Sequence, residues 1–191
     1  MTTEQKPREN RIYFLGNPWS EGHLIYDFEW EAEVRENDVW FTFHLGTDDY
    51  YAERDIEDDK DTEYDSDWEA PIVWGNYHSC ILSATNWHDG GFRVCSLEDY
   101  SLDRLDKHVF KVDSPPPDLK SMSEEDDLAF YIYLLGHDAV ADHRIEFTKQ
   151  KNSDLFDLQW SGKIALAYAG DFEFKYAFEA HLFDLEAPKI G

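Results

Sequence analysis

The sequence has little cysteine and little positive charge, and it has no long apolar run. Its 191 residues include two cysteines and 17 lysines and arginines. No segment approaches the roughly 20 apolar residues that a membrane-spanning helix needs. The first residues, MTTEQKPREN, contain no apolar stretch that would serve as a secretory signal. We therefore expect a cytoplasmic protein without membrane contact.

The two cysteines are expected to stay reduced. Cys80 and Cys95 flank a predicted hairpin that turns at Asp89-Gly90, a pair typical of tight hairpin turns. In that register the cysteines are out of step by about four residues, or about 13 Å, which is beyond the reach of a disulfide. Two free thiols agree with a reducing compartment.

The sequence also lacks the motifs that anchor nucleophilic or nucleotide chemistry. It contains no G-x-S-x-G elbow, no P-loop and no G-x-G-x-x-G. The neighbours His137-Asp138 and Asp142-His143 have the residue types of an acid/base pair, but such loop neighbours are more often solvated or turn-forming. We therefore expect no catalytic residues, and a binding protein rather than an enzyme.

Metal-binding residue types are present without metal-binding spacing. Four zinc-capable side chains lie within a short stretch that has no C-x-x-C or H-x-x-x-H spacing: His78, Cys80, His88 and Cys95. An EF-hand loop started at Asp59 would place Tyr64 at the required glycine and Ala70 at the required glutamate. A looser calcium site made of loop carboxylates remains an alternative, but we expect neither a metal nor a cofactor.

Acidic residues are in large excess. The chain has 42 aspartates and glutamates and a net charge of −25. A field of this sign repels nucleic acid and anionic lipid, and it speeds the encounter with basic proteins or cations. Because net charge bears on association and not on fold, solubility or adaptation to a salty cytoplasm remains an alternative explanation.

The acids are densest in residues 48–69, which we call the acidic segment. From Glu57 to Glu69 every odd-numbered residue is a carboxylate, so an extended chain would hold them all on one face. Neighbours about 7 Å apart would repel by about 0.6 kcal/mol in water. The run is therefore a solvated loop or a surface for a cation or a basic partner. The predicted partner-binding residues are Asp59, Asp61, Asp65, Asp67 and Trp68.

Several tryptophans near turns or on the predicted wet face are expected to be exposed. They are Trp19, Trp40, Trp68, Trp74 and Trp87. A tryptophan beside acids can stack on a sugar ring or act as a hot spot for a protein partner. The alternative is that a second sheet covers these rings.

Strict alternation predicts a hairpin over residues 24–45. Apolar residues occupy the even positions from 24 to 34 and the odd positions from 39 to 45. A turn at Glu36-Asn37 pairs 34 with 39, 32 with 41, 30 with 43 and 28 with 45, so that every pair is apolar. The outer face would then carry Glu29, Glu31 and Glu33 beside Trp40, Thr42 and His44.

The remaining chain is predicted to be mostly strands. Residues 72–74, 80–85 and 92–95 form short strands, 96–108 a short helix capped by Ser96, and 145–182 further hairpins with a turn near Gly170. Residues 123–136 have features of a helix and of a strand, and we favour a strand buried on both faces. Three prolines make 113–120 a surface connection.

These patterns predict an all-β fold, an antiparallel β-sandwich or flattened barrel of roughly eight to ten strands with one or two short helices. Residues 1–11 are expected to form a disordered tail, and 12–191 a single domain with the acidic loop 48–69. The expected function is recognition of a basic protein, as by an inhibitor or immunity-type protein. The alternatives are a carbohydrate-binding or carbohydrate-acting sandwich that uses exposed tryptophans, and a soluble domain of unassigned role.

Overall fold

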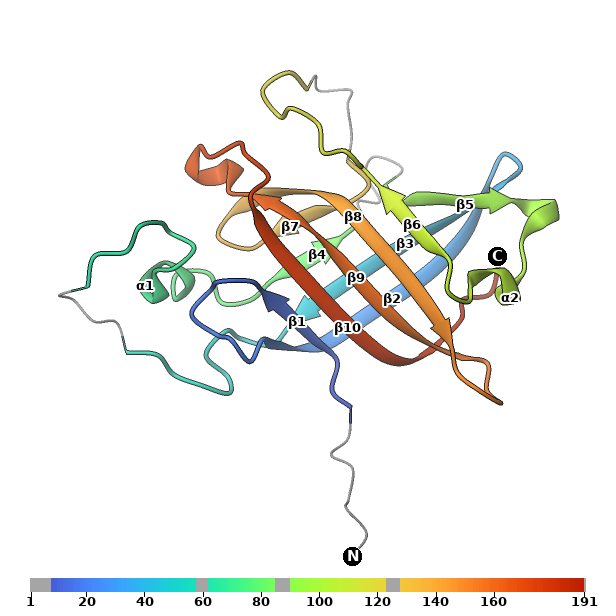
Figure 1. Ribbon diagram of the computed structural model, residues 1–191, viewed down its shortest axis with the longest axis horizontal. Helices are drawn as coiled ribbons and strands as arrows, with labels where there is room; N and C mark the ends of the chain where they lie inside the picture. Colours follow the sequence, from blue (N-terminus) through green and yellow to red (C-terminus); the bar gives the residue numbers. More distant parts are fainter. Residues whose placement is uncertain (1–7, 58–61, 85–89, 123–127, 191) are drawn as a thin grey trace, which may run out of the picture.

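A closed antiparallel barrel forms the body of the protein in a computed structural model, which describes residues 8–57, 62–84, 90–122 and 128–190. This part of the chain forms ten strands, and eight of them close the barrel in the order β2, β1, β10, β9, β8, β7, β4, β3 and back to β2 (Figure 1). The extra strands β5 and β6 pair with β3 and β8. The predicted all-β antiparallel fold is therefore confirmed.

Five of the ten described strands are long, namely β2, β3, β8, β9 and β10, and the other five are short. The bounds of the strands are β1 (Arg11–Phe14), β2 (His23–Arg35), β3 (Asp38–Thr47), β4 (Ile81–Ser83), β5 (Phe92–Ser96), β6 (Val109–Val112), β7 (Tyr131–Tyr133), β8 (His137–Lys149), β9 (Leu155–Ala165) and β10 (Tyr176–Glu186). The helical turns are α1 (Pro71–Trp74), η1 (Leu97–Asp99), α2 (Leu102–Leu105) and η2 (Ala167–Ala169). No helical turn in these ranges is long enough to form a layer of its own.

Two groups of long strands face each other across the core, and short strands join them. One group is the β2–β3 hairpin, and the other consists of β8, β9 and β10. On one side β1 joins β2 to β10, and on the other side β4 and β7 join β3 to β8. Because the joining strands are short, long stretches of the outer edges of the two groups are not bridged by them.

The predicted β2–β3 hairpin is confirmed in its register. The observed pairs are Val34 with Val39, Ala32 with Phe41, Trp30 with Phe43, and Phe28 with Leu45. The β3 members of these pairs are almost fully buried, because one face of the hairpin packs on the core. On the outer face Glu29, Glu31 and Glu33 lie beside His44, Thr42 and Trp40.

A bulge ends this regular alternation near Tyr26. The register shifts between Ile25 and Asp27, so Ile25 is buried and Tyr26 is 74% exposed. The sequence pattern places Tyr26 with the inward residues, and that prediction is wrong because an extra residue in one strand reverses the faces beyond it.

The hairpins predicted after residue 145 are confirmed as pairings. β8 and β9 pair through Lys149 and Phe156, and β9 pairs with β10. The second turn is longer than predicted, because it includes η2 before Gly170, which adopts a φ of 83°. Phe172, which the pattern assigns to a strand, lies in this connection and is largely exposed.

The hairpin predicted around Asp89-Gly90 does not form. β4 and β5 do not pair with each other; each pairs with a different part of β3. The turn residues themselves suggest a local hairpin, but pairing with the long central strand prevails over that local preference. Both cysteines are nevertheless free, Cys80 buried and Cys95 partly so.

Three segments differ from their predicted structure. Residues 72–74, predicted to be a strand, lie in the helical turn α1. The helix expected over 96–108 consists of two short turns, and Ser101 rather than Ser96 caps α2 by accepting a bond from the Asp103 amide. In the ambiguous region the described residues include strand β7, but only its centre is buried, with Tyr131 exposed. A strand is confirmed over residues 131–133 only, and its predicted burial on both faces is wrong.

Residues 8–11, which the sequence predicts to belong to a disordered tail, contact the barrel. Arg11 starts β1 and pairs with His181 of β10. Arg8 contacts the carboxylates of Asp157 and Asp184. The Arg11 side chain pairs with Glu9 and with Glu53 of the acidic segment. The sequence pattern does not reveal these long-range ion pairs.

The barrel interior is packed with aromatic rings and leaves no room at Gly162. A Cβ atom there would lie 2.7 Å from the Phe178 ring and 2.8 Å from Nδ1 of His143. We expect Gly162→Ala to lower the free energy of unfolding by about 1–3 kcal/mol, because the core would have to shift. Urea unfolding followed by tryptophan fluorescence measures this. Gly46→Ala is the matched control, since its Cβ would only touch Tyr26 at 3.4 Å; equal losses would contradict the prediction.

Candidate partner-binding surface

Trp68 fastens the acidic segment to one end of the barrel. Its side chain is 2% exposed, its ring stacks on Tyr176 with centroids 4.4 Å apart, and its Nε1 donates a hydrogen bond to the Leu15 carbonyl at 3.0 Å. Leu15 follows β1 and Tyr176 begins β10, so the segment is attached to two strands of the wall. The prediction that Trp68 is an exposed aromatic anchor is therefore wrong.

Two further tryptophans are buried at the same end. The Trp74 Nε1 donates to the Trp68 carbonyl at 2.9 Å, and the Trp19 Nε1 donates to the Arg54 carbonyl at 3.1 Å. Since each indole N–H has a backbone acceptor, burial leaves no unsatisfied donor. The predicted exposure of Trp19 and Trp74 is wrong. Trp40 is half-buried with Arg35 over its ring, and Trp87 lies outside the described residues.

The carboxylates next to this attachment point remain in solvent. Asp65 and Asp67 are exposed, and no lysine or arginine in the described ranges lies within ion-pair distance of either. Arg54, the basic residue of the segment that can be placed, pairs with Glu21 at 3.1 Å. Within the described part of the chain the negative charge at these two positions is thus uncompensated, while Asp59 and Asp61 lie outside it.

The outer face of β2–β3 is a second acidic surface, which we call the acidic hairpin face. Glu29, Glu31 and Glu33 are all exposed on it at alternate positions. Arg35 contacts Glu33, and no lysine or arginine of the described chain pairs with Glu29 or Glu31. Two carboxylates on one strand, those of Glu29 and Glu31, therefore face solvent without a counter-charge from the residues that the structure describes.

The acidic hairpin face continues into the acidic segment. β3 ends at Thr47, and the Asp48 amide donates to the Leu24 carbonyl at 2.9 Å, so the segment starts where the hairpin strands begin and end. Tyr26 lies at this junction over Gly46 and is largely exposed. Exposed tyrosines are common hot spots of protein interfaces. The alternating glutamates signalled this face in the sequence, but the tyrosine was missed because of the bulge.

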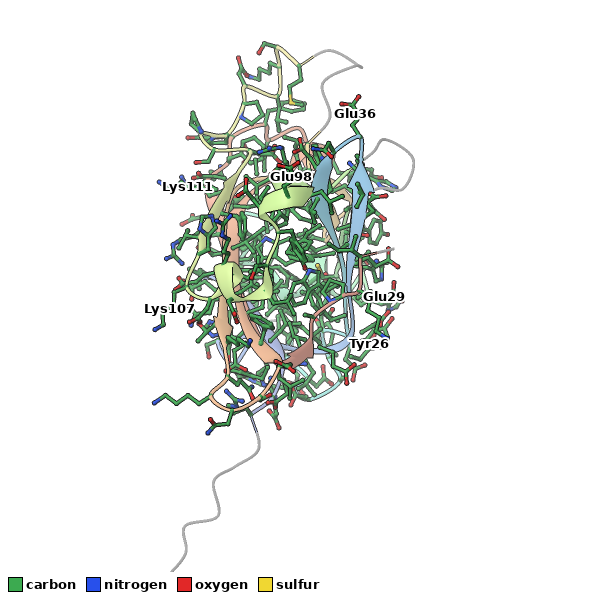
Figure 2. All side chains as sticks on the ribbon, turned by 90° about the vertical axis from the view of Figure 1, so that its right-hand side faces the viewer. Tyr26, Glu29, Glu36, Glu98, Lys107 and Lys111 are labelled. Carbon is green, nitrogen blue, oxygen red and sulfur yellow. The ribbon has the colours of Figure 1, made fainter. Side chains whose placement is uncertain are left out.

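Basic side chains gather on the opposite side of the barrel. Lys107 and Lys111 project from the β6 side, away from Tyr26 and Glu29 (Figure 2). Lys111 is paired in register with the exposed Arg144 of β8. Arg144 itself pairs with Glu146. Lys107 and Lys111 therefore place positive charge on the side of the barrel that lies away from Glu29.

A serine, a histidine and an aspartate meet beside the acidic hairpin face. The Ser83 hydroxyl donates to the Ala84 carbonyl at 3.0 Å, and Nδ1 of His44 lies 3.1 Å from the Ser83 hydroxyl oxygen. The Asp27 carboxylate lies 3.8 Å from Nε2 of His44, which is beyond hydrogen-bond distance. In a catalytic triad the acid is hydrogen-bonded to the histidine, so the three side chains are not assembled as a triad in this structure.

The His-Asp neighbours in β8 do not form acid/base pairs either. The Asp138 carboxylate accepts bonds from the Leu135 and Tyr168 amides, and burial raises its pKa. Asp142 pairs with Lys163 at 2.9 Å, whereas His143 points into the core and accepts a bond from Nε1 of Trp160 at 3.1 Å. Both aspartates therefore have structural partners.

The zinc-capable residues are not assembled where they can be placed. Cys80 is fully buried, and burial raises the pKa of its thiol, while His78 is exposed beside Asp49. His88 lies outside the described ranges. Within those ranges no group of three or more histidine, cysteine, aspartate or glutamate side chains has the arrangement of a metal site.

The comparisons with known proteins add no assignment. Searches with the chain against protein-family models, curated proteins and solved structures find no match. Among the residues that can be placed, no helix has the length and apolarity needed to cross a membrane. The functional interpretation therefore rests on the charges and contacts of the acidic side.

Proposed function

We propose that this chain is a recognition protein that binds a basic protein partner, as an inhibitor or immunity-type protein would. The binding side consists of the acidic hairpin face and the acidic segment, with Tyr26 between them. Electrostatic complementarity of this kind supplies fast association and selects against acidic partners. Nucleic acid and anionic membranes would be repelled by the same field.

One observation carries this proposal: the acidic segment keeps unpaired carboxylates although it is attached to the barrel. Asp65 and Asp67 have no basic partner in the described chain, while Trp68 next to them is buried and hydrogen-bonded. An attached segment loses less conformational entropy on binding than a free loop would. Charges that are fixed in place and uncompensated are the feature that a basic partner would use.

The alternatives find less support on this side of the molecule. Sugar binding through tryptophans would need exposed rings, and Trp19, Trp68 and Trp74 are buried. A role in solubility alone would be served by acids spread over the whole surface, whereas basic residues such as Lys107 and Lys111 gather opposite the acidic side. We therefore retain neither as the leading function.

Neutralising the acidic side should abolish partner capture. One variant carries Asp59→Asn, Asp61→Asn, Asp65→Asn and Asp67→Asn, and another carries Glu29→Gln, Glu31→Gln and Glu33→Gln. Each should weaken binding by about 100-fold, because close charge pairs at interfaces contribute several kcal/mol. The measurement is affinity capture from native cytosol at low salt with release at high salt, followed by titration of the purified partner.

The matched control removes three exposed carboxylates elsewhere, with Glu98→Gln, Glu173→Gln and Glu186→Gln. It should retain wild-type affinity. A partner that binds all three variants equally, or one whose affinity does not change with salt, would rule out the acidic side as the binding surface. A neutral sugar that quenches tryptophan fluorescence would favour the carbohydrate alternative instead.

A further inference from the structure

One edge of β2 has no strand beside it over most of its length. β3 covers the first edge from Ile25 to Arg35. On the second edge β1 pairs only with His23 and Leu24, and no other strand of the described chain reaches residues 27–35. The C-terminal residues 187–190 form no strand and make no backbone hydrogen bond to β2.

The backbone groups at this edge belong to the even-numbered residues. Arg35 pairs with Asp38 across the two-residue turn, which makes it a hydrogen-bonded pair with both backbone groups directed at β3. Because the direction alternates along a strand, Trp30, Ala32 and Val34 direct their N–H and C=O groups to the other edge. In the described chain no strand pairs with these groups, although Ala187 and Ile190 pack against the core.

The side chains at the edge are less buried than their partners on β3. Phe28, Trp30, Ala32 and Val34 are each partly exposed, whereas Phe41 and Leu45 of β3 are completely buried. Apolar surface at an unpaired strand edge is stabilised when a further strand covers it. The inward face of β2 thus favours an apolar residue at the matching positions of a partner.

The outward side chains define the charge of that partner. Glu29, Glu31 and Glu33 alternate with the inward residues and are exposed. A second copy of this chain, paired antiparallel through β2, would bring glutamates opposite glutamates, which is unfavourable. A strand with lysine or arginine at its outward positions would bring opposite charges together.

We propose that β2 accepts an extended segment of the basic partner as an additional antiparallel strand along residues 27–35. Lysine or arginine would alternate with apolar residues in this segment. Its apolar residues face the even positions of β2, so they also make the hydrogen bonds. This inference rests on the proposed function and specifies how the partner is held.

A synthetic peptide tests this on the wild-type protein. The probe is a peptide of about nine residues that alternates lysine and valine, matched to the length of the edge. The control peptide has the same sequence with N-methylated valine amides, so it keeps every charge but cannot donate the edge hydrogen bonds. We expect the control to bind about tenfold more weakly or worse at low ionic strength, since several hydrogen bonds are lost.

Amide hydrogen exchange by NMR locates the contact. In the free protein the amides of Trp30, Ala32 and Val34 should exchange faster than those of Glu29, Glu31 and Glu33, which face β3. The unmethylated peptide should slow exchange at the first three residues, and the methylated peptide should not.

The outcomes separate the two proposals. If both peptides bind equally and no even-numbered amide is protected, strand addition is wrong but binding through charge still holds. If neither peptide binds at low ionic strength, strand addition is also wrong, and the carboxylate variants above then decide on the proposed function separately. A protein that dimerises through β2 as salt is raised would show that a second copy covers the edge, which overturns the inference.

Discussion

Trp68→Ala should destabilise the protein and release the acidic segment without removing a single charge. Trp68 is almost fully buried, stacks on Tyr176 and donates a hydrogen bond to Leu15. Replacing a buried tryptophan by alanine costs about 3–5 kcal/mol of unfolding free energy. The lost contacts are those that hold residues 62–69 against the barrel, so binding of a basic partner should weaken even though Asp65 and Asp67 remain.

Urea unfolding and amide exchange measure these two effects. The free energy of unfolding should fall by the stated amount, and the amides around Trp68 should lose protection more than those of β9. Trp40→Ala is the matched control, because Trp40 is only half-buried on the outer face, and it should cost about 1 kcal/mol or less. Equal losses for the two variants would show that Trp68 does not anchor the segment.

Lowering the pH should reduce the free energy of unfolding through the protonation of His143. His143 is 1% exposed in the core, and burial lowers its pKa from 6.5 to about 3. Its Nδ1 accepts the bond from Trp160, so the neutral ring is the form that fits the site. In the unfolded chain the same residue takes up a proton near its ordinary pKa.

The direction follows from proton uptake in the two states. Below pH 6.5 the His143 ring binds a proton in the unfolded chain, but in the folded chain it does so only near pH 3. The free energy of unfolding therefore falls as the pH falls through this window. The loss approaches about 1.4 kcal/mol for each pH unit and about 5 kcal/mol in total. His23, whose pKa burial lowers to about 4, acts in the same direction.

His143→Gln isolates this contribution. Glutamine can accept the Trp160 hydrogen bond but does not titrate, so the difference in unfolding free energy between wild type and variant should shrink steadily from pH 6.5 to pH 3. The series is measured in urea at high ionic strength, where repulsion among the acids is screened. His137→Gln, at an exposed histidine, should keep the wild-type profile. Parallel pH profiles for wild type and His143→Gln would refute the role of burial.

Local patterns were sufficient to predict the strand pairing wherever one face of a hairpin is buried. The β2–β3 register follows from alternation and from a turn at Glu36-Asn37, because a slip by one residue would turn every apolar side chain to solvent. The same logic predicts the pairings of β8, β9 and β10. In these places short-range and long-range preferences agree.

Prediction failed where distant pairing decides the outcome. A strong turn signal at Asp89-Gly90 suggested a local hairpin, yet β4 and β5 both pair with β3. The bulge near Tyr26 reverses the faces of β2, and nothing in the alternation marks it. The first error arises because a local signal does not show which strand becomes the neighbour, and the second because an inserted residue leaves no mark in a two-residue period.

The candidate site was predictable in its charge but not in its aromatic residues. The density of acids in 48–69 can be read directly from the sequence, and Asp65 and Asp67 are exposed as expected. Trp68 has the same acidic neighbours but is buried, because its ring stacks on Tyr176 and its Nε1 donates a hydrogen bond to the Leu15 carbonyl. Both contacts are distant in sequence, so no local pattern distinguishes this tryptophan from an exposed one.

The placement of Lys107 and Lys111 opposite Glu29 has a consequence for how the molecule approaches other proteins (Figure 2). Positive side chains on one side and glutamates on the other give the molecule an electric dipole in addition to its net charge. The field of a cationic protein therefore exerts a torque on this molecule at distances of about a Debye length, roughly 8–10 Å. The rotation turns the carboxylates forward before any surfaces touch, so a larger share of collisions begins in the productive orientation.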